Sequence, residues 1–467
     1  MIAPLSFKPM SFAAISSAVP LEEKPTAMTE AHATLPVRII ELLKHLGLER
    51  AHFAACMPRD WEGLAATHAE LIASLTLICP MGINVHVLQS RSLPLLCVSG
   101  DRGRPGKETE RELAKLPGAR ALVLRDYFSP PWADPILHRR DEIGTAIIEF
   151  ISQLGAEASP AIAEPNGEIA EITYRIRGAG APLILLPLAL SPSQWEPLIE
   201  QLSRHCCTIT LGGAHVGMVA HLETRAQSSY MRVIDQLINE LNLTPGQSVL
   251  EVGCGPGAIV RRLAMRTQGR NKIVGVDVNQ YLLREAAALA RRDKLDRFIE
   301  FQTGDAEQLP FRNDQFDATI SCTVMEEGDA DRMLAEFVRV TKPGGKIGAV
   351  VRSTDLPRWV NLPLSAALKQ KVDAAGLFGG NVNDGGCADA SLYRRFNRAG
   401  LADVTMTPQW APHKNGERLQ YLHDRILALL NGDELFQWQD AVRKAQTDET
   451  FFIAEPFHCA VGTKRKG

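Results

Sequence analysis

The sequence predicts an α/β protein whose second half forms a doubly wound, mainly parallel sheet. Between residues 248 and 353, short apolar runs alternate with segments whose apolar residues recur at helical spacing. Strands that alternate with helices in this way pack as a parallel sheet with helices on both faces. The chain has 467 residues, of which 45% are hydrophobic, so it is long enough to bury more than one core, and we expect two or three domains.

Composition narrows the class of partner. The 51 lysines and arginines nearly balance the 54 aspartates and glutamates, which argues against a nucleic-acid binder and favours a small-molecule partner. The nine cysteines are scattered, odd in number and without C-x-x-C pairs, so we expect a reducing cytoplasm and no metal site. No apolar run reaches the roughly 18 residues that a membrane-spanning helix needs. The composition therefore predicts a cytoplasmic protein without a membrane span.

Prolines and small polar residues mark the expected domain boundaries. Pro4, Pro9 and Pro20 interrupt any sustained helix near the start of the sequence. The stretch "GAEASPAIAEPNGE" at 155–168 has the small, proline-bearing composition of a linker. We therefore expect four parts: a disordered leader over 1–34, an α/β region over 35–155, a short α/β segment over 165–222, and a main domain over 228–467.

The main domain yields an ordered series of elements. A helix from 228 ends before Pro245 and Gly246, which stop helices. The pattern then predicts strands at 248–253, 272–278, 299–304, 316–322 and 345–352, and helices from 257, at 279–293 and at 330–341. Further helices are expected near 391–399 and 417–431. Two apolar runs, at 402–410 and 451–464, suit a closing antiparallel pair.

A glycine-rich loop follows the first strand of this series. In "LEVGCGPGA" (250–258), Gly253, Gly255 and Gly257 leave the backbone bare where a strand passes into a helix. Glycine permits positive φ and close approach of a ligand, and the helix N-terminus offers free N–H groups and partial positive charge. The spacing of Gly253, Gly255 and Ala258 also satisfies the dinucleotide-binding fingerprint. At this point a dehydrogenase therefore remains an alternative.

Two aspartates follow the next strands of the sheet. Asp277 lies at the end of a strand, twenty positions after Gly257, where an open sheet presents a carboxylate to ribose hydroxyls. Asp305 follows the third strand, where its carboxylate can accept a hydrogen bond from an adenine amine. Downstream, nothing resembles a hydride-transfer site. The pair therefore predicts an adenosine-containing ligand.

From about residue 228 to its end, the chain resembles the class I S-adenosylmethionine-dependent methyltransferases. The motifs that carry the resemblance are "VLEVGCGPG", Asp277, "GDAEQLPF", "FDATIS" and "RVTKPGGKI". Within that family the chain is most similar to the ubiquinone and menaquinone biosynthesis methyltransferases. The resemblance implies a Rossmann-like, seven-stranded doubly wound sheet with a reversed last strand, and S-adenosyl-L-methionine as cofactor.

The resemblance also implies roles for individual residues. Glu251 would lie near the amino group of the cofactor, the three glycines would pass under its methionine part, and Asp277 would hold the ribose. Asp305 and Ala306 would bind adenine. The residues that would complete the site are Ser321, Cys322 and Thr323 after the fourth strand, and Tyr230 in the helix before the first strand.

The substrate side is defined less sharply. In this family, segments around Arg352, Asp355 and His413 line the substrate pocket, which makes these residues candidates for proton transfer. Each also has a structural interpretation, as a surface charge or a loop residue. Residues 353–400 would form a lid with an apolar wall, and this favours an apolar or aromatic acceptor. The wall would consist of Trp359, Leu362, Leu364, Leu368 and Leu377.

The first half of the chain resembles an α/β-hydrolase in degenerate form. Residues 35–153 are similar to the closing half of that fold, and residues 171–213 to its opening strands. At the expected nucleophile elbow the sequence reads Ala-Ala-Cys-Met-Pro around Cys56, without the glycines of G-x-S-x-G. A triad of Cys56, His138 and Asp101 is one hypothesis. A region kept for packing, dimerisation or substrate access is the other.

Together these observations predict a methyltransferase that acts on a small, apolar or aromatic organic molecule. Two alternatives of other classes stay open: a cofactor-binding scaffold or sensor without turnover, and a hydrolase acting through the first half. Whether carbon, oxygen or nitrogen is methylated is left undecided, and a homodimer is a hypothesis only.

Overall fold

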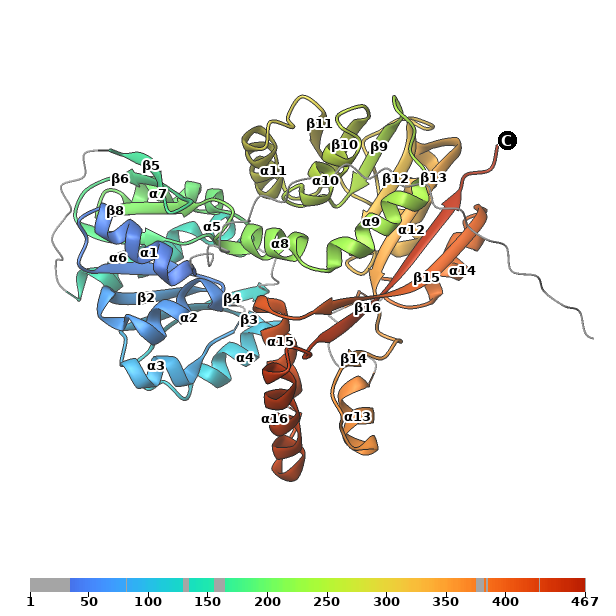
Figure 1. Cartoon of the computed structure of the whole chain (residues 1–467). Coiled ribbons are helices and arrows are strands. Elements are labelled where there is room, and N and C mark those ends of the chain that lie inside the picture. Colours follow the sequence, from blue (N-terminus) through green and yellow to red (C-terminus); the bar gives the residue numbers. More distant parts are fainter. Residues whose placement is uncertain are drawn as a thin grey trace, which may run out of the picture. The chain divides into compact units, whose positions relative to one another are not determined.

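The computed structural model describes residues 34–80, 82–128, 134–154, 164–374, 382–383, 385–427 and 429–466. Within these residues the strands form two sheets of eight strands each (Figure 1). The leader predicted for 1–34, apart from Thr34, and residues 155–163 of the predicted linker lie outside the described residues. The predicted domain boundaries therefore stay predictions.

The first sheet combines two separate stretches of the chain. Its strand order is β4-β3-β2-β1-β7-β8-β6-β5, and β1 pairs in parallel with β7, with Phe53 opposite Ile184. The antiparallel pairs in this sheet are β5 with β6 and β6 with β8, so β6 runs against its neighbours. The strands are β1 (Ala51–Ala55), β2 (Ile72–Ile78), β3 (Leu95–Arg102), β4 (Arg120–Phe128), β5 (Asn166–Ile169), β6 (Ile172–Arg177), β7 (Ala181–Leu185) and β8 (Cys206–Gly212). Residues 166–212 thus add four strands to a sheet that residues 51–128 begin.

Helices cover both faces of this sheet. One core lies under α1 and α2 and includes Trp61, and the other lies under α6 and α7 and includes Trp195. Strands β1 and β2 are buried at every position, as expected for central parallel strands that read as continuous apolar runs. The helices are α1 (Leu35–His45), α2 (Pro58–Thr67), α3 (Val85–Arg91), α4 (Gly103–Leu113), α5 (Pro135–His138), α6 (Arg140–Ser152) and α7 (Glu196–Leu202). The resemblance of this region to a hydrolase stays a prediction.

The second sheet has the predicted doubly wound arrangement. Its order is β11-β10-β9-β12-β13-β16-β14, and β15 also pairs with β16. Strand β16 runs antiparallel to β13, with Ala460 opposite Ala349, which confirms the reversed last strand (Figure 1). The strands are β9 (Ser248–Val252), β10 (Lys272–Asp277), β11 (Ile299–Thr303), β12 (Phe316–Cys322), β13 (Thr341–Arg352), β14 (Trp359–Val360), β15 (Ala402–His413) and β16 (Ile453–Thr463).

The number of strands in this sheet differs from the prediction. The resemblance implies seven strands, and the structure has eight, because the chain after β13 returns along β16 as the two-residue strand β14. Val360 of β14 lies opposite Ile453, and both side chains are buried. Two residues are too few for a periodic signal, so the sequence pattern could not predict this strand.

Helices pack on both faces of the second sheet. Tyr230 and Leu237 of α9 and Val260 of α10 belong to one core, whereas Phe337 of α12 and Phe396 of α14 belong to the core on the other face. The helices are α8 (Gly217–Gln227), α9 (Tyr230–Leu241), α10 (Ala258–Arg266), α11 (Gln280–Arg292), α12 (Ala330–Val340) and α14 (Ser391–Arg398). None of the helices that the described residues form is both long and apolar enough to cross a bilayer.

The remaining helices form a small core of their own. They are α13 (Ala366–Asp373), α15 (Gly416–Leu427) and α16 (Gly432–Thr447). Helix α16 was not expected, and its buried Trp438 packs between His423 and Phe451. Leu362 and Leu368, predicted to line a substrate pocket, are buried in this core, whereas Trp359 is 55% exposed. The apolar wall is therefore largely helix packing, and Leu377 lies outside the described residues.

Candidate functional site

The glycine loop and Asp277 meet at the carboxyl edge of the second sheet. Strands β9 and β10 run in parallel, so their carboxyl ends lie side by side. The N–H of Gly253 donates to the carbonyl of Val276 at 2.8 Å. The N–H of Gly255 donates to Oδ2 of Asp277 at 2.8 Å. The tertiary structure thus joins two features that are twenty-two positions apart in the chain.

Two of the three glycines serve packing within the protein. Gly253 has a φ of +76°, and a Cβ added there would lie 2.2 Å from Cγ2 of Val324. Gly257 has a φ of +81° at the start of α10, and an added Cβ would lie 3.1 Å from the ring of Phe301. At Gly255 the nearest atom would be Cδ1 of Leu222, at an ordinary 3.5 Å. The loop therefore needs glycine for its own folding as well as for any ligand.

Glu251, the residue before the loop, is a buried carboxylate with one free oxygen. Its side chain is 1% exposed, and Oε2 has no hydrogen-bond partner among the described residues. Burial raises the pKa of Glu251 well above its usual value, and the nearby charge of Asp277 raises it further, although a backbone hydrogen bond from Val260 opposes the shift. A buried, unsatisfied carboxylate is costly unless a ligand completes it. A positively charged ligand group would supply the missing partner of Oε2.

Asp277 is itself held in place by the backbone. Its Oδ1 accepts the N–H of Asn279 at 2.8 Å, and the Asn279 side chain in turn caps α11. Burial raises the pKa of Asp277, and the hydrogen bonds from Asn279 and Gly255 partly offset that shift. Each carboxylate oxygen keeps a lone pair for a further donor. Asp277 and Glu251 thus place two acidic groups on neighbouring strand ends, an arrangement suited to a ligand with hydroxyl donors and positive charge.

The residues predicted to contact adenine follow the neighbouring strand β11. The N–H of Gly304 donates to the carbonyl of Asp277 at 3.1 Å, which places Asp305 next to the end of β10. Asp305 is exposed, and its Oδ1 accepts the N–H of Glu307 at 2.8 Å. Ala306 is half-buried. The structure thus brings this turn beside Asp277.

The three residues at the end of β12 have different surroundings. Ser321 is buried and donates its hydroxyl to the carbonyl of Val252 at 3.1 Å, so this hydroxyl ties β12 to β9. Burial raises the pKa of the Cys322 thiol well above its usual value, which leaves it a neutral packing group. Thr323 has a φ of +58°, and its hydroxyl accepts a hydrogen bond from Nη2 of Arg225 at 2.8 Å.

Tyr230 lies beside these residues and below Arg225. The Tyr230 side chain is 4% exposed, and Thr323 lies within reach of its hydroxyl. The guanidinium carbon of Arg225 lies 3.8 Å from the centroid of the Tyr230 ring, a cation–π contact. Arg225 belongs to α8, before the predicted domain start at residue 228, and that boundary is why the sequence analysis missed it.

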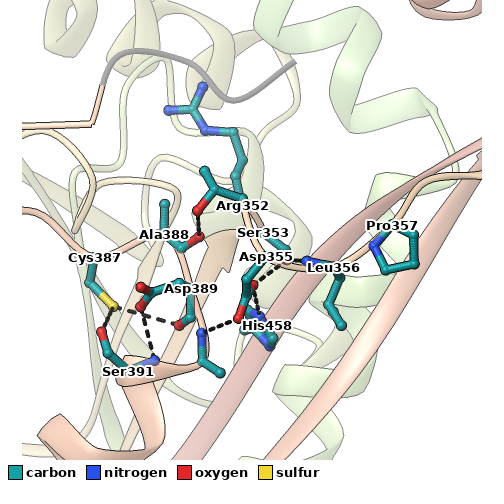
Figure 2. Close-up of polar contacts among 12 residues, drawn as sticks. Arg352, Ser353, Asp355, Leu356, Pro357, Cys387, Ala388, Asp389, Ser391 and His458 are labelled. Atoms are coloured by element: carbon teal, nitrogen blue, oxygen red, sulfur yellow. Dashed lines mark hydrogen bonds and ion pairs between the residues drawn. The ribbon is translucent and has the colours of Figure 1, made fainter. Parts of the chain in front are cut away.

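On the substrate side, Asp355 is a fully engaged carboxylate (Figure 2). It accepts hydrogen bonds from Nε2 of His458 at 2.7 Å, Oγ of Ser353 at 2.8 Å and the N–H of Ala390 at 2.9 Å. Burial alone would raise the pKa of Asp355, but these hydrogen bonds outweigh it and lower the pKa. The contacts tie the turn after β13 to β16 and to the segment before α14. Asp355 therefore serves as a structural anchor.

Arg352 points away from Asp355 (Figure 2) and binds two neighbouring glutamates. Its Nε lies 3.3 Å from Oε1 of Glu326, and its Nη2 lies 3.1 Å from Oε1 of Glu327. The two pairs differ in burial, since the Glu326 side chain is 1% exposed and the Glu327 side chain is 44% exposed. The sequence analysis missed Glu326, although it lies only three residues beyond Thr323.

His413, the third proposed proton-transfer residue, is held by Glu455. Nε2 of His413 lies 3.2 Å from Oε2 of Glu455, and Nε of Arg418 donates to the same carboxylate at 2.7 Å. Burial by itself would raise the pKa of Glu455, but the bonds from His413 and Arg418 outweigh it and hold the pKa well below its usual range. His413 therefore joins the end of β15 to the start of β16.

This depressed pKa predicts an acid-sensitive contribution to stability. A lowered folded-state pKa stabilises the fold at pH values above the unfolded pKa of about 4.3, and the effect is lost as the pH falls below it. We expect Glu455→Gln to lower the free energy of unfolding by about 2 kcal/mol at pH 7. The difference from the parent protein should stay close to its pH 7 value in urea unfolding at pH 5 and should shrink at pH 3.5. Glu300→Gln, at an exposed ion pair with Lys272, is the control, and an equal pH dependence in both variants would contradict the assignment.

The hypothetical triad in the first half has other contacts. Sγ of Cys56 donates to the carbonyl of Cys79 at 3.4 Å, and Nδ1 of His138 lies 3.0 Å from the hydroxyl of Tyr127. Asp101 accepts the N–H of Tyr127 at 3.2 Å. None of these three contacts is the nucleophile–base or base–acid contact that a triad uses.

The similarity to known proteins lies in the part of the chain that forms the second sheet. Residues 249–345 match a family model described as a methyltransferase domain. A demethylmenaquinone methyltransferase from Lactobacillus johnsonii is 31% identical over 150 residues, which cover 32% of this chain and 62% of that protein. A sterol 24-C-methyltransferase from Aspergillus fumigatus is 34% identical over 114 residues, which cover 24% of this chain and 29% of that protein.

The extent of these similarities is limited. The chain spans 62% or less of the lengths of these two relatives. Among solved structures, the YcgJ protein from Bacillus subtilis aligns with 51% of this chain and 100% of its own length at 18% identity, with a TM-score of 0.37, and the assignment does not rest on that likeness. The matched segment contains the glycine loop, Asp277 and strands β9 to β12. The chain therefore contains a class I, S-adenosylmethionine-dependent methyltransferase domain.

Proposed function

We propose that the protein transfers a methyl group from S-adenosylmethionine to a small organic acceptor. The observation that carries the proposal is Glu251, a buried carboxylate with an unpartnered oxygen beside the glycine loop. The cofactor brings two positive groups, an ammonium and a sulfonium, into a region where Glu251 and Asp277 supply negative charge. The carboxylates of Glu251 and Asp277 thus match the positive groups and the hydroxyl donors of the cofactor.

In this proposal, different residues around the loop bind different parts of the cofactor. Glu251 accepts a hydrogen bond from the ammonium of the cofactor, and Asp277 accepts hydrogen bonds from the ribose hydroxyls. Asp305 and Ala306 face the adenine, and Tyr230, Cys322 and Thr323 border the methionine part. The bound cofactor supplies a methyl group on a sulfonium, so the protein mainly aligns the acceptor and excludes water. Ser321 acts indirectly, because its hydroxyl fixes β12 to β9.

An apolar or aromatic acceptor is the finer part of the proposal. Two of the similar proteins are named for demethylmenaquinone and for a sterol, both largely apolar molecules. The near balance of 51 basic and 54 acidic residues gives no strong field for nucleic acid. We propose a cytoplasmic protein, which fits nine cysteines that are scattered through the sequence without C-x-x-C pairs. A homodimer stays a hypothesis.

The proposal predicts that cofactor binding releases protons. Burial raises the pKa of Glu251 in the free protein, whereas a bound ammonium would favour the carboxylate and so lower that pKa. We expect S-adenosylhomocysteine binding, measured by calorimetry in buffers of different ionisation enthalpy, to release a fraction of a proton at pH 7. Glu251→Gln should abolish the release and weaken binding by about 10- to 30-fold.

A matched control and a transfer assay complete the experiment. Glu285 on α11 also has a pKa raised by burial, so Glu285→Gln tests whether any such glutamate has the same effect. Transfer of labelled methyl groups from S-adenosylmethionine into small-molecule extracts then tests turnover. Cofactor binding without any transfer would favour the scaffold hypothesis. Unchanged binding and proton release in Glu251→Gln would refute the assigned role of Glu251.

A further inference from the structure

We infer that Glu326 accepts a proton from the methyl acceptor, so that the acceptor carries an O–H or N–H group. This inference rests on the proposed methyl transfer and names the class of its substrate. Glu326 follows β12, in the stretch "TVMEEGD", and none of the features considered from sequence assigned it a role.

The carboxylate of Glu326 is oriented on one side and free on the other. Oε1 accepts the N–H of Arg352 at 2.8 Å and lies 3.3 Å from Nε of the same residue. The side chain is 1% exposed, and Oε2 has no hydrogen-bond partner among the described residues. A buried carboxylate oxygen left unpaired costs free energy that a donor from a ligand would recover. The geometry thus leaves one acceptor position ready for a ligand.

The neighbours of Glu326 place its side chain near the proposed cofactor site. Tyr230 and Cys322 are both close enough to Glu326 to sense its charge, and Cys322 also senses the charge of Glu251. Val324, two residues before Glu326, packs against Gly253 of the glycine loop. Oε2 of Glu326 is therefore an unpartnered buried polar atom, among the described residues, near the end of β12.

The segment predicted to form a lid holds the backbone of Glu326. The N–H of Asn383 donates to the carbonyl of Glu326 at 2.9 Å, and the N–H of Cys387 donates to the carbonyl of Met325 at 2.8 Å. These bonds fix the loop that carries the carboxylate. The lid segment thus contributes to the position of Glu326 rather than only to an apolar wall.

The electrostatic surroundings allow Glu326 to exchange a proton. Burial raises its pKa, and Arg352 opposes that shift through its charge and hydrogen bonds without cancelling it. Among the described residues, other charged or titratable groups near it include Glu327 on the same loop, Cys322 on β12, and Tyr230 on α9 with Arg225 against its ring. A carboxylate with a raised pKa suits general base catalysis near neutral pH.

The proposed step is balanced in atoms and charge. The proton of the acceptor moves to Oε2 of Glu326, the freed electron pair of the acceptor atom bonds to the methyl carbon, and the sulfur keeps the electrons of the broken S–C bond. The products are the methylated acceptor, neutral S-adenosylhomocysteine and a protonated Glu326. The proton then returns to solvent.

Binding of hydroxyl probes tests the inference without relying on turnover. Phenol, catechol and 2-naphthol are titrated by calorimetry into the protein saturated with S-adenosylhomocysteine, with naphthalene as the probe that lacks a hydroxyl. We expect Glu326→Gln to weaken the binding of the tightest hydroxyl probe by about 10-fold or more and to leave the affinity for naphthalene unchanged. In the parent protein, affinity for the hydroxyl probe should rise with pH as Glu326 ionises, and this rise should be absent in Glu326→Gln.

Glu327→Gln is the matched control, because Glu327 pairs with the same Arg352 but has an exposed side chain. It should keep the parental affinity and pH profile. If the parent protein fails to bind S-adenosylhomocysteine, the proposed function fails. If it binds S-adenosylhomocysteine but none of the three hydroxyl probes, or if Glu326→Gln and Glu327→Gln behave alike, the inference about Glu326 is overturned while the proposed function stands.

Discussion

Asp277→Ala is expected to weaken S-adenosylhomocysteine binding by about 100-fold or more. A carboxylate that accepts two ribose hydroxyls contributes about 1.5–3 kcal/mol per hydrogen bond, and each 1.4 kcal/mol is about tenfold in affinity. The variant also frees the N–H groups of Gly255 and Asn279, which Asp277 holds at 2.8 Å each. The loop would then lose its tie to β10, and calorimetric titration with S-adenosylhomocysteine measures the combined loss.

A second aspartate provides the control for this experiment. Asp329 starts α12 and accepts the N–H groups of Asp331 and Arg332, much as Asp277 accepts the N–H of Asn279. Asp329→Ala should lower the free energy of unfolding by about 1 kcal/mol through the lost cap and leave cofactor affinity unchanged. Equal affinities in Asp277→Ala and the parent protein would remove Asp277 from the site.

Gly253→Ala is expected to lower the free energy of unfolding by about 2–5 kcal/mol. A φ of +76° costs an L-residue about 1–2 kcal/mol, and a methyl group forced against a packed neighbour costs about 1–3 kcal/mol more. The neighbour is Val324, whose Cγ2 would lie 2.2 Å from the added Cβ. Urea unfolding measures the loss, and the glycine loop should also bind S-adenosylhomocysteine more weakly.

Gly400 separates the two causes of this destabilisation. It has the same φ of +76°, but nothing lies within 4 Å of an added Cβ. Gly400→Ala should therefore show the backbone cost alone. Adding Val324→Ala to Gly253→Ala should recover part of the difference between the two single variants. If Gly253→Ala and Gly400→Ala lower the free energy of unfolding equally, the contact with Val324 does not contribute to the destabilisation.

Much of the second sheet could be predicted from periodicity. The expected strand at 272–278 is β10 at Lys272–Asp277, and the expected helix at 279–293 is α11 at Gln280–Arg292. These elements are predictable because alternating patterns and capping residues are local signals. Helix α16 was missed because its burial depends on the contact of Trp438 with His423 and Phe451, which periodicity did not reveal.

The candidate site was predicted only where a motif defined it. Glu251 and the glycine loop lie in one short motif and Asp277 is a second. In the structure, the N–H of Gly255 donates to Asp277. Asp355 and His413 were candidates for proton transfer because their segments line the substrate pocket in the family that the chain resembles, and in the structure both contact residues of β16 through hydrogen bonds or ion pairs. Glu326 and Arg225 lie near the end of β12, where Arg225 donates to Thr323 and Glu326 pairs with Arg352, and no local pattern distinguishes them from surface charges.

By itself, the sequence determined the order of strands and helices from β9 to β13, the position of the glycine loop and the acidic residues at neighbouring strand ends. Only the tertiary structure decided which carboxylates are already occupied and which keep a free oxygen. It also decided that residues 166–212 complete the sheet begun by residues 51–128. The physical reason is that periodicity and capping are set by residues a few positions apart, whereas burial, hydrogen-bond partners and pKa depend on residues brought together from distant parts of the chain.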